Sequence, residues 1–376
     1  MSKLEQLINE LCPNGVEFMK LGDFCEIKTG KGITKSDAAL GGTFPIISGG
    51  QSPMGYYHIS NRGANTVTIS RVGAYAGFVS YIKEQFYLND KCFSVIPIAE
   101  KLSTSFLYYV LKGMECKIKE LQSEGGVPTI NTTKVSNLEI PLPPLPVQEE
   151  IVRILDVFTD YTAELQAELQ AELQARQEQY EYYRNKLLSF EDDSSVEWKK
   201  LGDVCAILDS RRRPVSKGKR VKGIYPYYGA NGIQDYVDDY IFNGTYLLVG
   251  EDGSVINKDK SPVLNWATGR IWVNNHAHIL SETDSGANLR YLYYALSVTD
   301  VSDVVRGTPP KLNQKNLQNL LIPIPPLPVQ EEIVAILDKF EALVNDLTEG
   351  LPAEIAARQE QYEYYRDKLL SFPKAV

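Results

Sequence analysis

The sequence is poor in the residues that most often carry enzymatic chemistry. Of its 376 residues only 3 are histidine and 5 are cysteine. No Gly-x-Ser-x-Gly, His-Glu-x-x-His or Gly-x-Gly-x-x-Gly motif occurs. The Asn/Asp-Pro-Pro-Tyr/Phe element of amino-methyl transfer is also missing, because the Pro-Pro pairs stand in PLPPLP, GTPPK and PIPPLP. These absences argue against catalysis by the chain itself.

Signals for membranes and secretion are equally lacking. No run approaches the roughly 18–20 apolar residues that span a bilayer, and the opening MSKLEQLINELC has no apolar signal core. The cysteines are scattered and odd in number: Cys12, Cys25, Cys92, Cys116 and Cys205. We therefore expect reduced, buried thiols in a cytoplasmic protein. A 43% hydrophobic content indicates a folded chain, and its length favours two or three domains.

Two short patterns resemble cofactor sites and fail on inspection. Residues 28–36 approach a phosphate-binding P-loop, but Thr34 precedes Lys35-Ser36 where the pattern requires glycine. His276 and His278 could suggest a metal pair. With one other histidine and no clustered cysteine, a surface or strand pair is the favoured interpretation, so we expect no metal.

Acidic charge is concentrated in two segments. The chain has a net charge of −9, yet residues 149–193 carry −8 and residues 331–376 carry −5. The remainder is therefore mildly basic. Local patches, and not the whole-chain charge, decide whether a nucleic acid can bind.

A tandem repeat organises the chain. KLGDFCEI at 20–27 recurs as KLGDVCAI at 200–207, and PPLPVQEEIV at 143–152 recurs unchanged at 325–334. ARQEQYEYYR at 175–184 recurs at 357–366, and LLSF follows in both halves. Residues 28–125 and 208–305 match only at scattered points, such as Pro45 with Pro226 and Asn131 with Asn313. A near-identical segment beside a divergent one indicates one scaffold carrying two different heads.

The repeated segments predict long helices. Ile151, Phe158 and Leu165 step by seven, and so do Leu173, Tyr180 and Leu187, which is a heptad stripe with one stutter. The second copy repeats the stripe at Ile333, Phe340, Leu347, Ile355, Tyr362 and Leu369. Since lone helices of this kind are poorly stable, we expect the two copies to pack on each other, antiparallel if they are structurally equivalent. Pro352 is expected to kink or interrupt the distal copy.

The divergent segments predict mixed domains. Short β-branched or aromatic runs bounded by turn residues predict strands at 66–70, 86–88, 92–96, 246–249 and 270–273. Residues 104–112 and 287–296 predict short helices. The expected fold class is α+β, with two globular domains separated by two long antiparallel coiled-coil helices in a pseudo-two-fold tandem repeat. The expected boundaries are 1–142 and 191–324 for the heads, and 143–190 and 325–376 for the helices.

A basic loop is the strongest candidate for a nucleic-acid contact. RRRPVSKGKRVK at 211–222 follows a predicted strand and contains no acid. Charge runs are often only solvated loops, but seven bases in this place favour phosphate binding: Arg211, Arg212, Arg213, Lys217, Lys219, Arg220 and Lys222. The equivalent stretch of the first half is weaker and has the same sign, with Lys28, Lys31 and Lys35.

Glycine-rich loops and tyrosine clusters provide further candidates. Residues 70–77 and 250–254 each follow a strand-like run, and Arg71 and Tyr75 in the first could contact DNA; simple turns are about as good an interpretation. Lone amides such as Gln51, Asn231 and Gln234 usually decorate loops. Each long helix also carries a cluster suited to protein interfaces, at Tyr180, Tyr182 and Tyr183 and at Tyr362, Tyr364 and Tyr365. Packing of these tyrosines against the chain's own heads is the alternative.

Taken together, these segments resemble the specificity subunits of type I restriction–modification enzymes. The resemblance rests on two variable heads, each ending in PPLPVQEEIV and a long helix, and on the repeated AELQ at 163–174. It implies two target recognition domains at 1–142 and 191–324, each reading one half of a bipartite double-stranded DNA target. It also implies docking of two methyltransferase subunits and of motor–nuclease subunits. S-adenosylmethionine, ATP and Mg would belong to those partners, and this chain would bind no cofactor.

Two other classes of function remain open at this point. A fused methyltransferase or nuclease is disfavoured by the missing motifs, and methylation of DNA by the chain alone would favour it. A coiled-coil adaptor without a DNA role is disfavoured by the basic loop, and salt-dependent DNA binding separates the two.

Overall fold

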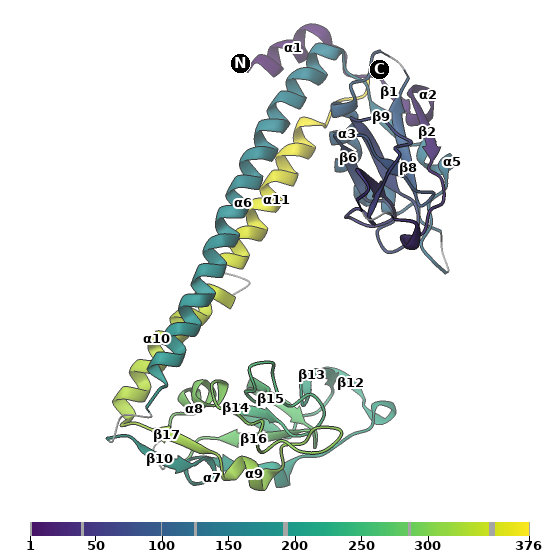
Figure 1. Ribbon diagram of the computed structural model, residues 1–376. Coiled ribbons are helices and arrows are strands. Elements are labelled where there is room, and N and C mark those ends of the chain that lie inside the picture. The colour runs from purple at the N-terminus through teal and green to yellow at the C-terminus, as the bar shows by residue number, and fades with distance from the viewer. Residues whose placement is uncertain are drawn as a thin grey trace. The chain divides into compact units, whose positions relative to one another are not determined.

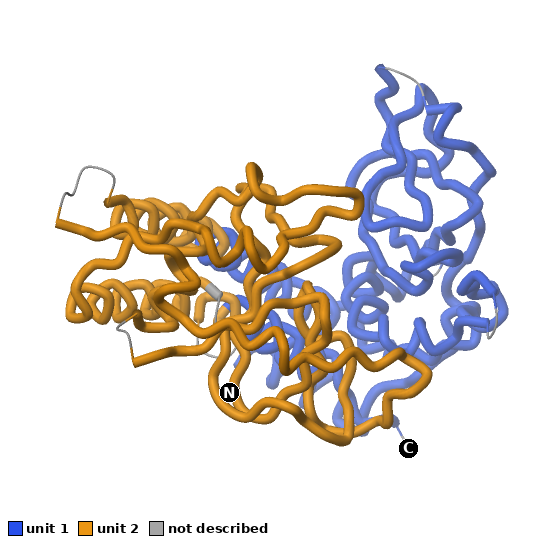
Figure 2. Tube along the Cα trace, turned by 90° about the horizontal axis from the view of Figure 1, so that it is seen from below, with its two compact units in different colours: residues 1–169, 355–376 blue, residues 170–354 orange. Residues whose placement is uncertain are grey.

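Two compact units make up the structure. The computed structural model describes residues 2–38, 41–98, 100–123, 126–190, 195–284, 287–345 and 350–375. Unit 1 comprises residues 1–169 and 355–376, and unit 2 comprises residues 170–354 (Figure 2). Each unit therefore combines one head with parts of the long helical segments. Among the described residues, no helix has both the length and the apolar content needed to cross a membrane.

The head of unit 1 is built on small sheets in which β3 and β7 pair in parallel and the other strands pair antiparallel. A four-stranded sheet has the order β2-β8-β5-β6, a three-stranded sheet the order β4-β3-β7, and β1 pairs with β9. Its elements are α1 (Lys3–Leu11), β1 (Phe18–Lys20), α2 (Leu21–Phe24), β2 (Cys25–Thr29), η1 (Lys35–Asp37), β3 (Phe44–Ile47), β4 (Tyr56–Tyr57), β5 (Thr66–Ser70), β6 (Val79–Ile82), β7 (Tyr87–Leu88), β8 (Cys92–Pro97), α3 (Thr104–Gly113), α4 (Glu115–Lys119), α5 (Thr132–Ser136) and β9 (Glu139–Pro141).

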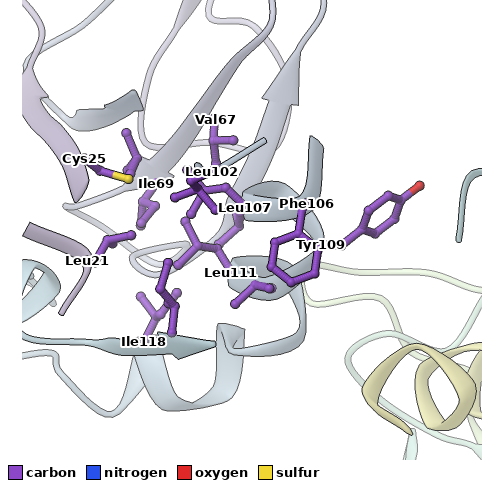
Figure 3. Close-up of a cluster of buried hydrophobic side chains, with 14 of the residues drawn as sticks. Leu21, Cys25, Val67, Ile69, Leu102, Phe106, Leu107, Tyr109, Leu111 and Ile118 are labelled. Atoms are coloured by element: carbon purple, nitrogen blue, oxygen red, sulfur yellow. The ribbon is translucent and has the colours of Figure 1, made fainter. Parts of the chain in front are cut away.

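The core of this head lies between the four-stranded sheet and helix α3. Figure 3 shows Val67 and Ile69 of β5 facing Phe106 and Leu107 of α3. All four side chains are buried, as the β-branched strand and the short apolar helix predict. Tyr109 stands at the margin of this cluster, with its hydroxyl directed away from it (Figure 3).

The head of unit 2 has the same framework around a larger sheet. Six strands follow the order β11-β16-β14-β15-β12-β13, and β10 pairs with β17 as β1 pairs with β9. Its elements are β10 (Glu197–Lys200), α7 (Leu201–Val204), β11 (Ala206–Ile207), η2 (Asp209–Arg211), η3 (Lys217–Lys219), β12 (Lys222–Gly229), β13 (Gly232–Val237), β14 (Phe242–Gly250), β15 (Leu264–Val273), β16 (Ala277–Ser281), α8 (Leu289–Ser297), α9 (Gln314–Gln318) and β17 (Leu321–Ile324). The predicted α+β class is confirmed.

The repeated segments form long helices. Helix α6 (Leu145–Leu187) runs for 43 residues, whereas the second copy contains α10 (Leu327–Asn345) and α11 (Leu351–Leu369), all labelled in Figure 1. Pro352 stands in the first turn of α11, where the missing N–H has no helical partner to lose. Residues 346–349, between α10 and α11, lie outside the described residues, so the effect of Pro352 on the continuity of the distal helix stays a prediction. Leu347, predicted to continue the heptad stripe, lies outside the described residues.

Within unit 1, the helices α6 and α11 pack side by side and antiparallel. The hydroxyls of Thr159 and Tyr362 are 3.0 Å apart, and Gln166 Nε2 donates to Gln359 Oε1 at 2.9 Å. Residue numbers increase along α6 from Thr159 to Gln166 while those of their partners on α11 decrease from Tyr362 to Gln359, so the two helices are antiparallel. Within unit 2, Tyr183 stacks on Phe340 with ring centroids 5.8 Å apart. This is the repeat equivalent of the contact between Tyr365 and Phe158 in unit 1.

A buried glutamine fastens each head to its long helix. Gln148 of α6 accepts the backbone N–H of Ser103, just before α3, at 2.9 Å and donates to the carbonyls of Lys101 and Pro143. Gln330 of α10 accepts the N–H of Asn288, just before α8, at the same distance. It also donates to Pro325 O. These are the glutamines of the two PPLPVQEEIV motifs.

A tyrosine–aspartate contact repeats the fastening two turns further along the helix. Tyr109 of α3 donates to Asp156 Oδ1 at 2.6 Å, and Tyr294 of α8 donates to Asp338 Oδ1 at 2.6 Å. Unit 2 adds Arg290, which pairs with Asp338 and Glu341. Each head is therefore held at two points on one helix face, spaced eight residues apart or about 12 Å.

We predict that Gln148→Leu destabilises unit 1. The substitution leaves the Ser103 N–H and the Lys101 and Pro143 carbonyls without their partner, at a cost of about 2 kcal/mol of unfolding free energy. Urea denaturation followed by circular dichroism measures the change. Gln170→Leu, at an exposed position of the same helix, is the control, and equal midpoints for both variants would contradict the prediction.

Candidate nucleic-acid interface and helix surfaces

The basic loop of unit 2 is fastened across its sheet. Trp272 of β15 donates its indole N–H to Arg213 O at 2.6 Å. The hydroxyl of Tyr227 in β12 accepts the N–H of Val215 at 3.0 Å. The loop therefore has a defined path, and its seven bases divide into two groups.

Arg220 belongs to the group that holds the loop in place. Its guanidinium donates to Val215 O at 3.0 Å, pairs with Asp235 at 3.2 Å and lies 4.1 Å from the centroid of the Tyr227 ring. The N–H of Tyr236 and the guanidinium of Arg220 lower the pKa of the Asp235 carboxyl. With 14% of its side chain exposed, Arg220 is engaged within the loop, and its phosphate contact stays a prediction.

Arg212 is likewise committed, to a buried network of charges. Its guanidinium pairs with Glu251 and, at 3.4 Å, with Asp209, and donates to Ala277 O at 3.0 Å. His278 Nδ1 lies 2.6 Å from Asp209 Oδ2, and Lys311 Nζ lies 3.1 Å from Glu251 Oε1. Only 14% of the Arg212 side chain is exposed. Two internal carboxylates already neutralise Arg212, so it is a weaker candidate for a phosphate contact than its exposed neighbours, and that contact stays a prediction.

The same network contains ligand types suited to a metal ion. Ligand atoms of Asp209, Glu251 and His278 lie within 4.8 Å of one another. The Arg212 guanidinium already supplies the cation that the two carboxylates need. In addition, His278 Nε2 is 2.8 Å from Leu312 O, so both ring nitrogens are engaged. The arrangement therefore fits an internal ion network better than a metal site. His278 lies in strand β16, in agreement with the interpretation of this histidine as a strand residue.

The remaining bases of the loop are available to a ligand. Arg213, Lys217, Lys219 and Lys222 are exposed and form no ion pair with any residue that the structure describes. Arg211 is also exposed, and its guanidinium lies 4.8 Å from the centroid of the Phe242 ring. The loop thus has five exposed cations, and its backbone is held in place by the internal contacts of Arg212 and Arg220.

The equivalent stretch of unit 1 presents fewer free cations. Lys28 of β2 pairs with Glu26 on the same strand. Lys31 and Lys35 are exposed, and Lys35 begins η1 beside Asp37, whose carboxylate accepts from Thr34. This weaker patch agrees with the lower density of bases in the sequence.

The two glycine-rich loops occupy equivalent places. Gly73 N donates to Pro128 O in unit 1, and Gly253 N donates to Pro310 O in unit 2, both at 3.0 Å. Tyr75 is exposed in the first loop, and Arg71 at its start is half-buried. Gln51, Asn231 and Gln234 are exposed, and Gln234 accepts from Asn274.

The tyrosines of each cluster point in different directions. Tyr180 and Tyr362 are partly buried, and burial together with Glu341 raises the pKa of Tyr180. Tyr183 and Tyr365 pack on the neighbouring helix within their units. Tyr182 and Tyr364 are 60% and 62% exposed. Tyr183 and Tyr365 therefore pack on the other long helix and not on a head, and the equivalent Tyr182 and Tyr364 remain exposed.

Sequence reasoning missed the residues that attach the heads. Gln148 and Gln330 are fully buried polar side chains, and their only signal was an identical position in two identical motifs. Tyr109 with Asp156 and Tyr294 with Asp338 had no signal, because their partners lie more than 40 residues apart in the sequence.

Comparison with known proteins decides the family. The family model described as type I restriction modification DNA specificity domain matches residues 13–175 and again 194–357. The chain belongs to this family. The two matches confirm the tandem repeat, and they confirm the resemblance to type I specificity subunits inferred from the motifs.

Relatives of this family are similar over all or half of the chain. The specificity subunit of an Escherichia coli type I restriction enzyme is 28% identical over 100% of this chain and 98% of its own. A putative type I specificity subunit of Haemophilus influenzae is 44% identical over 48% of this chain, and this match spans 47% of that relative. These relatives are named as specificity subunits, so the expectation of a specificity subunit in place of a catalytic one is confirmed.

Solved structures agree in fold. A chain from a study of complex assembly and conformational transition of the type I restriction–modification system has a TM-score of 0.67 at 18% identity, covering 95% of this chain and 98% of that one. The S subunit from M. genitalium gives a TM-score of 0.52 at 17% identity, covering 95% and 96%. At this identity the likeness concerns the fold alone.

We predict that Arg212→Met destabilises unit 2 by about 3–5 kcal/mol, because Glu251 and Asp209 lose the cation between them. Urea or thermal denaturation gives the change. Lys217→Met removes an exposed cation of the same loop and is expected to change stability by less than about 0.5 kcal/mol. A similar, small effect of both substitutions would show that the network contributes little.

Proposed function

We propose that this chain is the DNA-recognition subunit of a type I restriction–modification complex, and that each head reads one half of a bipartite target. The basic loop at 211–222 carries this proposal. Its five exposed cations stand on a rigid frame in which Arg212 and Arg220 are satisfied internally. Cations held in a fixed geometry suit a regularly spaced row of phosphates.

The long helices are the proposed docking surface for two methyltransferase subunits. Tyr182 and Tyr364 occupy equivalent positions of the two repeats and are exposed in both. Lys186 and Lys368 lie near their rings, at 5.8 and 6.0 Å. An exposed aromatic ring beside a cation is a common anchor of protein interfaces. Two equivalent anchors fit two copies of one partner.

The chemistry is assigned to the partners. Methyl transfer with S-adenosylmethionine is proposed for the methyltransferase subunits, and ATP and Mg for motor–nuclease subunits that join them. The proposed setting is the cytoplasm, where free thiols stay reduced. Four of the five cysteines are buried as free thiols, and Cys116 is exposed.

Neutralising the exposed loop is expected to weaken DNA binding without disturbing assembly. For the double variant Lys217→Gln with Lys219→Gln, we expect the slope of log affinity against log salt to fall by nearly 2, because each phosphate contact contributes about 0.9. The measurement is fluorescence anisotropy with the assembled complex and a target duplex identified by methylome sequencing.

The matched control removes two exposed lysines elsewhere in unit 2, Lys258→Gln with Lys339→Gln. Its slope is expected to equal that of the parent. An unchanged slope in the loop variant would refute the proposed phosphate contacts. A parent complex without salt-dependent binding would refute the DNA-recognition role itself.

Replacing Tyr182 and Tyr364 by Asp is expected to release a co-purifying methyltransferase, because a carboxylate in an apolar interface is costly to desolvate. Affinity purification of the tagged chain gives the stoichiometry of the complex. Tyr161→Asp is the control, since Tyr161 lies on α6 and is 64% exposed but belongs to neither cluster. Retention of the methyltransferase by the double variant would place its docking surface elsewhere.

A further inference from the structure

The backbone hydrogen bonds of the two glycine-rich loops allow the heads to be compared residue by residue. Arg71 N donates to Lys91 O at 2.9 Å in unit 1, and Glu251 N donates to His276 O at 2.8 Å in unit 2. Ile130 N donates to Arg71 O, and Leu312 N donates to Glu251 O, both at 2.8 Å. Arg71 and Glu251 therefore occupy the same position of the framework.

The strand register extends this correspondence. Ser70 pairs with Cys92 and Gly250 pairs with Ala277, so Phe93 is the counterpart of His278. Ile27 pairs with Val95 and Ile207 pairs with Leu280, so Thr29 is the counterpart of Asp209. Lys31 N donates to Leu88 O, and Arg213 N donates to the equivalent carbonyl of Val273, so Gly30 is the counterpart of Arg212. The charged residues of the unit 2 network, Asp209, Arg212 and Glu251, therefore have no counterpart of the same charge in unit 1. The counterparts of the two carboxylates are Thr29 and Arg71.

A guanidinium nevertheless occupies the same place in both heads. Arg71 Nη1 donates to the carbonyl of Asp90 at 3.1 Å, and Arg212 Nη1 donates to the equivalent carbonyl of Asn275 at 3.4 Å. One comes from the glycine-rich loop and the other from the basic loop. In unit 2 the carboxylates of Glu251 and Asp209 neutralise it.

Arg71 has no such neutralisation. Among the residues that the structure describes, no carboxylate lies within 4.0 Å of its guanidinium, and its Nε is the buried side-chain nitrogen left without a hydrogen-bond partner. The contacts that remain are the Asp90 carbonyl and the Phe93 ring, whose centroid is 5.4 Å away. A half-buried cation that lacks a counter-ion is costly unless an anion from outside completes the site.

We propose that Arg71 forms a phosphate-binding site for the DNA backbone in unit 1, and that unit 2 lacks this site because Glu251 and Asp209 occupy it. The inference rests on the proposed DNA-recognition role and deepens it. The first head would hold the backbone through one anchored guanidinium at its glycine-rich loop. The second would hold it through the exposed basic loop, so the two heads grip the backbone with different elements of a shared framework.

The test compares Arg71→Gln, Arg71→Lys and the parent in the assembled complex, by anisotropy with target and unrelated duplexes over a range of salt concentrations. For Arg71→Gln we expect about tenfold weaker binding and a salt slope lower by about 0.9. The loss is expected to be the same for both duplexes, since a phosphate contact carries no sequence information. Arg71→Lys keeps the charge and is expected to restore the slope.

Arg62→Gln is the matched control within unit 1. Each of its three guanidinium nitrogens donates one hydrogen bond, to Ser94 Oγ, Asn61 O and Thr29 O, and burial lowers its pKa despite Glu26 nearby. Arg62→Gln is expected to lower the melting temperature and to leave the slope unchanged. The inference would be overturned if Arg71→Gln behaved in the same way, or if its loss were confined to the target duplex. Because the parent's own salt dependence tests the proposed function, the two failures are distinguishable.

Discussion

A buried amide is the first of the two contacts that attach each head to a long helix. Gln148 and Gln330 each satisfy a backbone N–H just before the first turn of a head helix and the carbonyl of a proline five residues before the amide. A buried amide stabilises the attachment only when the head and the helix are placed so that all these hydrogen bonds form. Any bond that does not form leaves a buried polar group without a partner, which costs free energy. This explains why the chain can change almost the whole surface of a head while PPLPVQEEIV stands unaltered in both copies.

The second constraint is electrostatic. The basic residues within 211–222 form two groups, which differ in whether their side chains make ion pairs within unit 2. Arg212 and Arg220 are neutralised by Glu251, Asp209 and Asp235 and fix the loop, whereas the remaining bases are exposed. A flexible basic loop would lose conformational entropy on binding. A loop held by internal ion pairs has already lost part of it, so its exposed cations are preorganised.

Much of the architecture could be predicted from the sequence, because period and repetition are local signals. The strand at 66–70, the helix at 104–112 and the long helix from PPLPVQEEIV onward all appear where the pattern places them. The roles of individual charges could not be predicted. Nothing in RRRPVSKGKRVK distinguishes Arg212 from Arg213, since the difference lies in Glu251, 39 residues further along the chain. Pairing across such distances is a property of the fold.

The comparison between the two heads carries this argument one step further. The two heads share one framework but carry different charges at equivalent positions. In unit 2 a carboxylate stands at the position of Arg71, and the cation it needs is Arg212, from a position that is Gly30 in unit 1. Both heads hold a guanidinium at the same carbonyl group, from Arg71 in unit 1 and from Arg212 in unit 2. Only the guanidinium of unit 2 has carboxylate counter-ions. Under the proposed DNA-recognition role, a change of charge at the position of Arg71 and Glu251 therefore changes which loop binds the phosphates, and it leaves the contacts of Gln148 and Gln330 with the heads unchanged.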